Sequence, residues 1–272
     1  MFSPDDLTAI LGERINPTGR DRLAEELRQG QLDLALSDAR AQAEAGADYI
    51  CVNVGAPGVD ETKLLPRLVM EVAESTGLAV CVDSADSAAL VAALEAYRSP
   101  QAIINSITAD DQSMDAVLPL VQEHGCYVIA MTKDSESIPT NPEGRKAKAE
   151  RLLERAEAYG VPRERVLVDC LTFPAAAADT EAALVTLQSI ADISQSLECP
   201  VVLGASNISF GMPSRPVINH VFLAMAIQAG LNAAIVNPLQ PDLVLTVRAA
   251  DFMLGKDKMG RAYLKYYRAH RG

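Results

Sequence analysis

Residues 79–84 read Ala-Val-Cys-Val-Asp-Ser, and residues 87–97 read Ser-Ala-Ala-Leu-Val-Ala-Ala-Leu-Glu-Ala-Tyr. The first stretch is a short β-branched apolar run that ends in polar residues, which is typical of a strand buried on both faces of a sheet. The second has apolar residues at three-to-four spacing, which predicts a helix. This unit, a buried strand followed by a helix, recurs along the chain and decides the fold.

Eight runs of the first kind are predicted as strands: Ala9–Arg14, Tyr49–Val54, Ala79–Val82, Ala102–Ile104, Tyr127–Met131, Val166–Val168, Val201–Leu203 and Ala233–Val236. The segments between them are predicted as helices, among them Leu32–Ala45, Ser87–Tyr97, Met114–His124, Pro142–Tyr159 and Thr180–Leu197. Eight βα units with right-handed crossovers close naturally into a barrel, so we expect an α/β protein that is a single (β/α)8 TIM barrel. A doubly wound sheet would instead carry a GxGxxG turn after its first strand, where this chain reads Gly-Glu-Arg-Ile-Asn-Pro.

The length and charge of the chain limit its organisation and its partners. No linker or low-complexity tract interrupts the 272 residues, so residues 1–272 are predicted to form one domain. The net charge of −12, without a long basic run, disfavours nucleic acid as a partner. The N-terminus is not of the signal-peptide type, and no run of roughly 18 apolar residues follows it. We therefore expect a cytoplasmic protein with no membrane partner.

The cysteines and histidines do not form a metal-binding pattern. The five cysteines are dispersed singly, without a CxxC pair, and are predicted to be reduced core thiols: Cys51, Cys81, Cys126, Cys170 and Cys199. The three histidines are equally scattered, at His124, His220 and His270. Since a zinc site needs clustered ligands at fixed spacing, no metal is expected.

Polar residues end nearly every predicted strand, and TIM-barrel active sites lie at that face: Glu13, Asn16, Asn53, Asp83, Ser84, Asn105, Ser106, Asp169, Ser206 and Asn207. Any one of them is explained equally well as a helix N-cap. Caps do not explain carboxylates and amides at the ends of strands three, four and six with no lysine or arginine beside them. A reduced pterin offers both donors and acceptors to such groups, whereas a phosphate would need basic residues.

These strand ends resemble a known family. The matching stretches are Gly12-Glu13-Arg14-Ile15-Asn16, Asn53-Val54-Gly55, Val82-Asp83-Ser84, Ile104-Asn105-Ser106, Val168-Asp169, Leu203-Gly204-Ala205-Ser206-Asn207-Ile208-Ser209 and Arg215-Pro216. In their order and spacing they are similar to the methyltetrahydrofolate:corrinoid protein methyltransferases. The resemblance runs from Ile10 to about Ala234.

The resemblance implies a pterin-binding set at the strand ends, consisting of Asp83, Asn105, Asp169, Gly204, Ser206 and Arg215. The first three would bind the pterin ring, the next two would line the same slot, and the arginine would brace the loop after strand seven. Asn207 would be the catalytic residue and would face N5 of the folate. Its carboxamide can accept a hydrogen bond from a protonated N5 or donate one to a neutral N5.

Three features depart from the family pattern. Cys51 stands where the family often has an aspartate, and Cys170 replaces a frequent proline after Asp169. The first two changes should leave the pterin slot intact. The loop Phe210-Gly211-Met212 replaces more polar residues. The family's contacts around the methyl group therefore do not carry over directly to this loop.

The resemblance implies an enzyme that moves a methyl group between N5 of tetrahydrofolate and the cobalt of a corrinoid. The chain lacks an Asp-x-His-x-x-Gly signature, so cobalamin should be carried by a separate corrinoid protein. Homodimerisation is implied by the resemblance only, and the direction of transfer stays open. Two alternatives remain: a dihydropteroate synthase-like pterin enzyme, which would need a lysine near the end of strand seven, and a noncatalytic folate-binding subunit.

Overall fold

The computed structural model describes residues 2–176 and 181–271. Among the described residues, eight parallel strands pair in sequence order and close on themselves. They are β1 Ala9–Ile15, β2 Tyr49–Asn53, β3 Ala79–Asp83, β4 Ile103–Thr108, β5 Tyr127–Met131, β6 Val166–Asp169, β7 Val201–Gly204 and β8 Ala233–Val236. The predicted (β/α)8 barrel is therefore confirmed.

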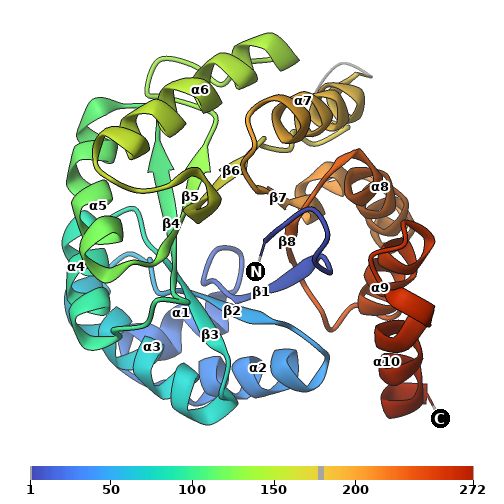
Figure 1. The fold of residues 1–272 in the computed structure, drawn as a ribbon. Coiled ribbons are helices and arrows are strands. Elements are labelled where there is room, and N and C mark those ends of the chain that lie inside the picture. Colours follow the sequence, from blue (N-terminus) through green and yellow to red (C-terminus); the bar gives the residue numbers. More distant parts are fainter. Residues whose placement is uncertain (1, 177–180, 272) are drawn as a thin grey trace.

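Helices surround the ring of strands (Figure 1). The α-helices of the described residues are α1 Asp21–Arg28, α2 Asp33–Glu44, α3 Glu61–Thr76, α4 Ser87–Ala96, α5 Asp111–His124, α6 Pro142–Ala158, α7 Ala182–Ser196, α8 Arg215–Ala229, α9 Leu243–Met253 and α10 Arg261–Arg271, and the 3-10 helices are η1 Arg163–Arg165, η2 Ala205–Ser209 and η3 Lys258–Gly260. None of these helices has the combination of length and apolar character that crossing a membrane requires.

The predicted element boundaries agree with the structure to within a few residues, with one consequence for the site. Strand four was expected to end before Asn105 and Ser106, but β4 continues to Thr108. Both polar residues therefore lie inside the strand.

The predicted helix before strand seven begins partly outside the described residues. Its expected first residue, Thr180, is not among them, and α7 begins at Ala182.

The strands divide the apolar core into an outer and an inner part, because successive side chains of a strand point to opposite faces. Outward residues such as Ile50 and Val82 pack with the helices. Inward residues form a separate inner cluster, consisting of Phe2, Ala9, Leu11, Tyr49, Cys51, Cys81, Ile103, Ile129, Leu167, Val202 and Ala233. All five cysteines are buried and none forms a disulfide, as predicted.

The N-terminal segment covers the end of the barrel where the strands begin. The ring of Phe2 stacks on Tyr49, with centroids 5.8 Å apart, and meets the edge of Tyr127 at 5.1 Å. Figure 1 shows the N-terminus over the middle of the ring of strands. Since this end is covered by aromatic side chains, the opposite end is left for a ligand.

A buried charge network ties α9 to the start of β1. Asp251 is fully buried and accepts hydrogen bonds from Thr8 through the backbone N, at 3.1 Å, and through Oγ1, at 2.7 Å. Arg248 donates to the Thr8 carbonyl at 2.8 Å and pairs with Asp48 at 3.1 Å. These bonds fasten α9, the helix that follows β8, to the start of the first strand.

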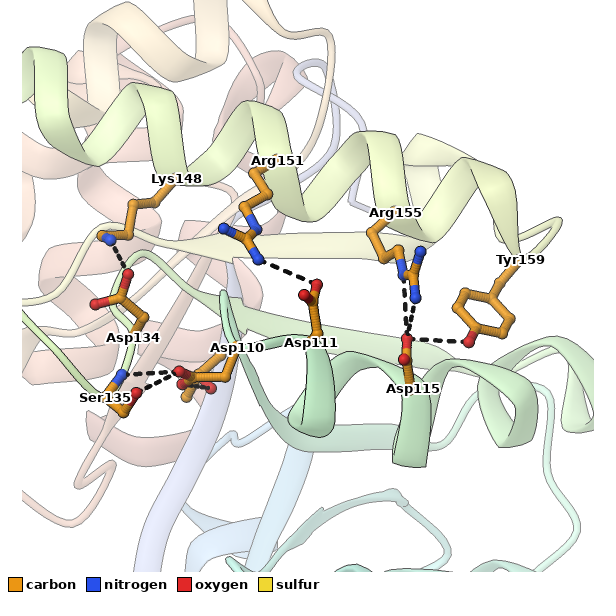
Figure 2. Close-up of polar contacts among 10 residues, drawn as sticks. Asp110, Asp111, Asp115, Asp134, Ser135, Lys148, Arg151, Arg155 and Tyr159 are labelled. Carbon is orange, nitrogen blue, oxygen red and sulfur yellow. Dashed lines mark hydrogen bonds and ion pairs between the residues drawn. The ribbon is translucent and has the colours of Figure 1, made fainter.

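Ion pairs on the surface join α5 to α6, as Figure 2 shows. Arg151 reaches Asp111 at 3.0 Å, and Arg155 reaches Asp115 at 2.6 Å. Tyr159 also donates to Asp115 at 3.0 Å. The side chains of both ion pairs are substantially exposed, so solvent screens the pairs and their effect on stability is small.

Removing the buried carboxylate of Asp251 should therefore lower the free energy of unfolding far more than removing the exposed carboxylate of Asp115. We expect Asp251→Ala to lower the free energy of unfolding by about 3–5 kcal/mol, because Arg248 and the Thr8 donors lose a buried partner. Asp115→Ala is the control and should leave stability nearly unchanged. Urea unfolding of the three proteins measures both effects, and equal losses in the two variants would contradict this account of the barrel closure.

Candidate functional site

The alternation that builds the inner cluster also builds the floor of a cavity. In each strand, the residue two positions after the last residue of the inner cluster points inward as well. This layer consists of Glu13, Asn53, Asp83, Asn105, Met131, Asp169, Gly204 and Ile235, and all of them line one cavity. The cavity lies at the carboxyl ends of the strands, where barrel enzymes place their chemistry.

The cavity has a volume of about 1110 Å³, and loop residues complete its walls. Every residue of the predicted set lines it: Asp83, Asn105, Asp169, Gly204, Ser206, Asn207 and Arg215. The structure thus brings together side chains that are more than 130 positions apart in sequence. Their roles toward a ligand remain predictions.

Two carboxyl groups of this layer, Asp83 and Asp169, are buried, and the charges of Arg145 and Lys133 offset only part of the effect of burial on the pKa of Asp169. Burial raises the pKa of Asp83 to about 6, although a hydrogen bond with Asn53 offsets part of the effect. Burial likewise raises the pKa of Asp169 to about 6, and its Oδ1 accepts one hydrogen bond, from the backbone N of Leu171 at 2.7 Å. Such groups gain from a ligand that donates hydrogen bonds to them.

Glu13 is a site residue that the sequence analysis saw at a strand end but did not include in the predicted set. Ser206 Oγ donates to Glu13 Oε1 at 2.9 Å, which links the end of β1 to the loop after β7. Burial raises the pKa of Glu13 above its ordinary value. Only the tertiary contact reveals this pair, since 193 positions separate the two residues.

Arg215 holds the loop after β7 in place. Its Nε donates to Ser209 Oγ at 2.9 Å and its Nη2 to the Ser206 carbonyl at 3.1 Å. The guanidinium also lies over the ring of Phe210, 4.5 Å from the centroid. These contacts join the start of α8 to the loop, and Phe210 stays half-exposed at the rim.

Asn207 is exposed at the cavity and stands beside Gly204. A Cβ at Gly204 would lie 3.3 Å from Asn207 Nδ2, so the absence of a side chain there leaves the amide room to turn. Both residues line the cavity. The position suits an amide that approaches a ligand atom rather than one that packs in the core.

One expectation is corrected. The ends of strands three, four and six were expected to have no lysine or arginine beside them, but Arg14, Arg20, Lys133 and Arg215 line the cavity that these strand ends form. The last three are in loops or at a helix start beyond the strands, and these segments fold back over the mouth. The sequence analysis included Arg215 in the predicted set, but it missed Arg20 and Lys133 because both lie in loops beyond the strand ends.

The loop that carries Lys133 is fastened to α5 at the rim. Asp110 accepts hydrogen bonds from Ser135 through the backbone N at 3.0 Å and through Oγ at 2.6 Å (Figure 2). These bonds and one from Thr108 lower the pKa of Asp110 to about 2. Lys148 forms an ion pair with Asp134 in the same loop. The β5–α6 loop is thus held beside the cavity.

No metal centre is found in the part of the chain that the structure describes. No three histidine, cysteine, aspartate or glutamate side chains there are grouped so that they could hold an ion. The cavity lining instead offers carboxylate, amide, hydroxyl and cationic groups, which suit hydrogen bonding to an organic ligand.

A closed ring of eight parallel strands with a polar cavity at their carboxyl ends defines the fold class of the protein as a TIM barrel. The model of the pterin binding enzyme family matches residues 12–237, and the chain belongs to this family. The expected resemblance to a pterin-binding barrel is therefore confirmed.

Two curated relatives cover most of the chain. It is 28% identical over 267 residues to the methylcorrinoid:tetrahydrofolate methyltransferase of Eubacterium limosum, which covers 95% of this chain and 96% of the relative. It is 32% identical over 251 residues to the methionine synthase of Mycobacterium tuberculosis, covering 87% of this chain. The match spans only 21% of that larger synthase.

Solved structures of dihydropteroate synthases share the fold. The enzyme from Clostridium difficile, determined in the presence of pteroic acid, superposes with a TM-score of 0.73 at 18% identity, covering 93% of this chain and 99% of that one. The Yersinia pestis enzyme superposes with a TM-score of 0.68 at 17% identity, covering 93% and 96%. Likenesses at this identity show the barrel fold alone.

The raised pKa of Asp169 predicts a pH-dependent cost to stability. A carboxyl with a folded pKa of about 6 and an unfolded pKa near 3.8 favours folding less as pH rises from about 4 to 6. Asp169→Asn removes this cost and keeps the Oδ1 acceptor. The variant should therefore gain about 2 kcal/mol relative to wild type between pH 4.5 and pH 7.5.

Urea unfolding at the two pH values measures this gain. Asp110→Asn is the control, because the lowered pKa of Asp110 confines its effect to pH values below about 4. Its difference from wild type should hardly change over the same range. A difference between Asp169→Asn and wild type that is independent of pH would show that Asp169 is not buried as a high-pKa carboxyl.

Proposed function

We propose that this protein is a methyltransferase that moves a methyl group between N5 of tetrahydrofolate and the cobalt of a corrinoid carried by a separate protein. The observation that carries the proposal is the convergence of Asp83, Asn105, Asp169 and Asn207 on one cavity in a chain of the pterin binding enzyme family. The near full-length match to a methylcorrinoid:tetrahydrofolate methyltransferase supports it. In this proposal residues 1–272 act as one cytoplasmic pterin-binding domain.

The floor of the cavity suits the ring of a reduced pterin. The 2-amino group and the ring N–H groups of the pterin are donors that Asp83 and Asp169 can accept, and the Asn105 amide can serve donor and acceptor atoms alike. Hydrogen bonds from the ring would stabilise the ionised form of these carboxyl groups, which burial destabilises. The ring is therefore both recognised and held in one orientation, with Gly204 and Ser206 along its slot.

Methyl transfer from N5 makes a specific demand on the site. The bond between N5 and the methyl carbon breaks, its electron pair stays on N5, and N5 takes up a proton from solvent. A new bond forms between the carbon and cobalt with the electron pair of cobalt(I). An amine leaves poorly unless N5 is protonated or hydrogen-bonded as the bond breaks. Asn207 meets this need without becoming charged, and the same contacts serve the reverse reaction.

This chain lacks the lysine that dihydropteroate synthase chemistry would need after β7. That chemistry would need a lysine near the end of β7, where this chain continues from Gly204 into Ala205-Ser206-Asn207. The one lysine that lines the cavity, Lys133, follows β5 instead. The residues after β7 therefore favour methyl transfer over condensation.

A turnover assay tests the proposed function and separates it from a noncatalytic folate-binding role. The purified protein, tetrahydrofolate and a methylated corrinoid protein are mixed without oxygen, and the visible spectrum of the corrinoid reports loss of its methyl group. We expect turnover with the corrinoid protein and much slower transfer with free methylcobalamin, which lacks docking contacts. Tight folate binding without any methyl transfer would assign the chain to a binding role.

Asn207 should affect rate more than substrate binding. We expect Asn207→Ala to lower kcat by about 10²-fold or more, because a hydrogen bond that strengthens as charge develops stabilises the transition state. KM for tetrahydrofolate should change little. Steady-state kinetics in the spectral assay give both constants, and a raised KM with an unchanged kcat would make Asn207 an ordinary binding residue.

The proposed enzyme is a homodimer that uses an apolar stripe on α8. Val217, Val221 and Met225 recur at four-residue spacing with 64%, 57% and 46% of their surface exposed. Such a stripe on a helix is typical of an interface. Leu184 on α7, packed next to α8, is also exposed.

A charge in the α8 stripe should therefore separate the subunits. We expect wild type to sediment as a dimer and Val221→Glu to sediment mainly as a monomer, because the carboxylate would be buried without a partner. Ile138→Glu, an exposed apolar position in the β5–α6 loop, is the control and should stay dimeric. A monomeric wild type, or a Val221→Glu dimer of undiminished stability, would contradict the proposed interface.

A further inference from the structure

The charge of the cavity differs from that of the whole molecule. The chain carries a net charge of −12, yet the cavity lining contains more basic than acidic side chains, with Arg14, Arg20, Lys133 and Arg215 against Glu13, Asp83 and Asp169. A neutral pterin ring gives no reason for this excess. The cations point to an anionic part of the ligand.

Two of these cations share a single carboxylate. Arg14 Nε contacts Asp38 Oδ1 at 3.2 Å, and Arg20 Nη1 contacts Asp38 Oδ2 at 2.6 Å. Asp38 lies on α2 and is largely buried behind the two guanidinium groups. Two positive charges against one negative charge leave this cluster, Arg14–Arg20–Asp38, with a net charge of about +1 at the cavity wall.

Both guanidinium groups of the cluster keep unused donors. Among the described residues, the Arg14 side chain bonds only through Nε, and the Arg20 side chain only through Nη1, which also contacts the Arg14 carbonyl. Their other nitrogens have no protein acceptor there. The Arg215 guanidinium, in contrast, is already engaged by Ser209, Ser206 and Phe210.

The cluster lies on the side of the barrel where a folate tail would leave. In the proposed pose the ring contacts β3, β4 and β6, and N5 faces Asn207 after β7. The carbon that bears the p-aminobenzoyl-glutamate tail is the ring neighbour of N5, whereas the 2-amino group is at the far end of the ring. The tail therefore points toward the arc β7–β8–β1 of the closed barrel, and Arg14 and Arg20 belong to the end of β1 and the loop after it.

Resting on the proposed function, we propose that Arg20, together with Arg14, binds the glutamate carboxylates of the folate tail. Guanidinium groups bind carboxylates in a two-pronged geometry, and the spare nitrogens of the cluster offer such donors. The volume of about 1110 Å³ exceeds the roughly 300–1,000 Å³ of most ligand pockets, which leaves space for the tail beside the ring. Arg20 is then a specificity residue that distinguishes folates from pterins without a tail.

Calorimetric titration with two ligands tests the assignment. Tetrahydrofolate carries the tail, and 6-methyltetrahydropterin has the same ring system without it; both are titrated in the absence of oxygen. We expect Arg20→Ala to raise the Kd for tetrahydrofolate about tenfold, the effect of one charge-assisted hydrogen bond at a partly exposed site. The Kd for 6-methyltetrahydropterin should stay unchanged, which also shows that the variant is folded.

Three comparisons strengthen the test. Arg22→Ala, two positions further on α1 and 82% exposed at its side chain, should bind both ligands like wild type. Arg20→Lys should recover part of the lost affinity because it keeps the charge. In wild type, added salt should weaken tetrahydrofolate binding more than 6-methyltetrahydropterin binding, because screening acts on the tail carboxylates. This last comparison needs no variant to fold.

Failure of the inference and failure of the proposed function give different results. If neither ligand binds wild type, the proposed function is wrong and the inference falls with it. If both bind but Arg20→Ala and salt affect them equally, the tail assignment alone is overturned. If tetrahydrofolate affinity is unchanged in Arg20→Ala while transfer from a corrinoid protein slows, the cations serve the partner protein and the tail assignment is likewise overturned.

Discussion

The alternation of side chains along parallel strands, in a barrel closed on itself, is the constraint on which the rest of the structure depends. Each strand first fills the interior with apolar side chains and, two residues later, turns one more side chain inward. At that second position the interior opens, so the side chains form the floor of a cavity instead of a core. Asp83, Asn105 and Asp169 occupy this layer because their strands end there or pass through it.

Buried polar groups in such a layer destabilise the folded state unless they form hydrogen bonds. The structure limits this destabilisation in two ways. The Ser206 hydroxyl satisfies one oxygen of Glu13, and Arg215 fixes the loop that carries Ser206. Burial raises the pKa of the remaining two carboxyl groups, Asp83 and Asp169, to about 6, so each takes up a proton more readily than an exposed carboxyl group. The site is thereby preorganised on strands, and the stability that it forgoes is recovered when a ligand with matching donors binds.

The sequence predicted those parts of the structure that depend on the spacing of apolar residues, which repeats every two residues in strands and every three to four residues in helices. The barrel and the inward positions of Asp83 and Asp169 follow from short apolar runs that end in polar residues. Sequence reasoning failed where tertiary contacts decide: β4 passes beyond Asn105, which no local signal marked. It also missed Arg20 and Lys133, because their positions at the cavity depend on how the loops after β1 and β5 fold back, and loop geometry has no sequence periodicity.

The account is tested most directly by a crystal structure of the protein with bound tetrahydrofolate, in which the distance between N5 and the side-chain amide of Asn207 is measured. The account predicts the pterin ring on the inward layer, with Asp169 bonded to ring donors and the Asn207 amide about 2.7–3.2 Å from N5. A ring bound elsewhere in the barrel, or one that leaves Asp169 without a ring contact and N5 beyond hydrogen-bond reach of Asn207, would contradict it.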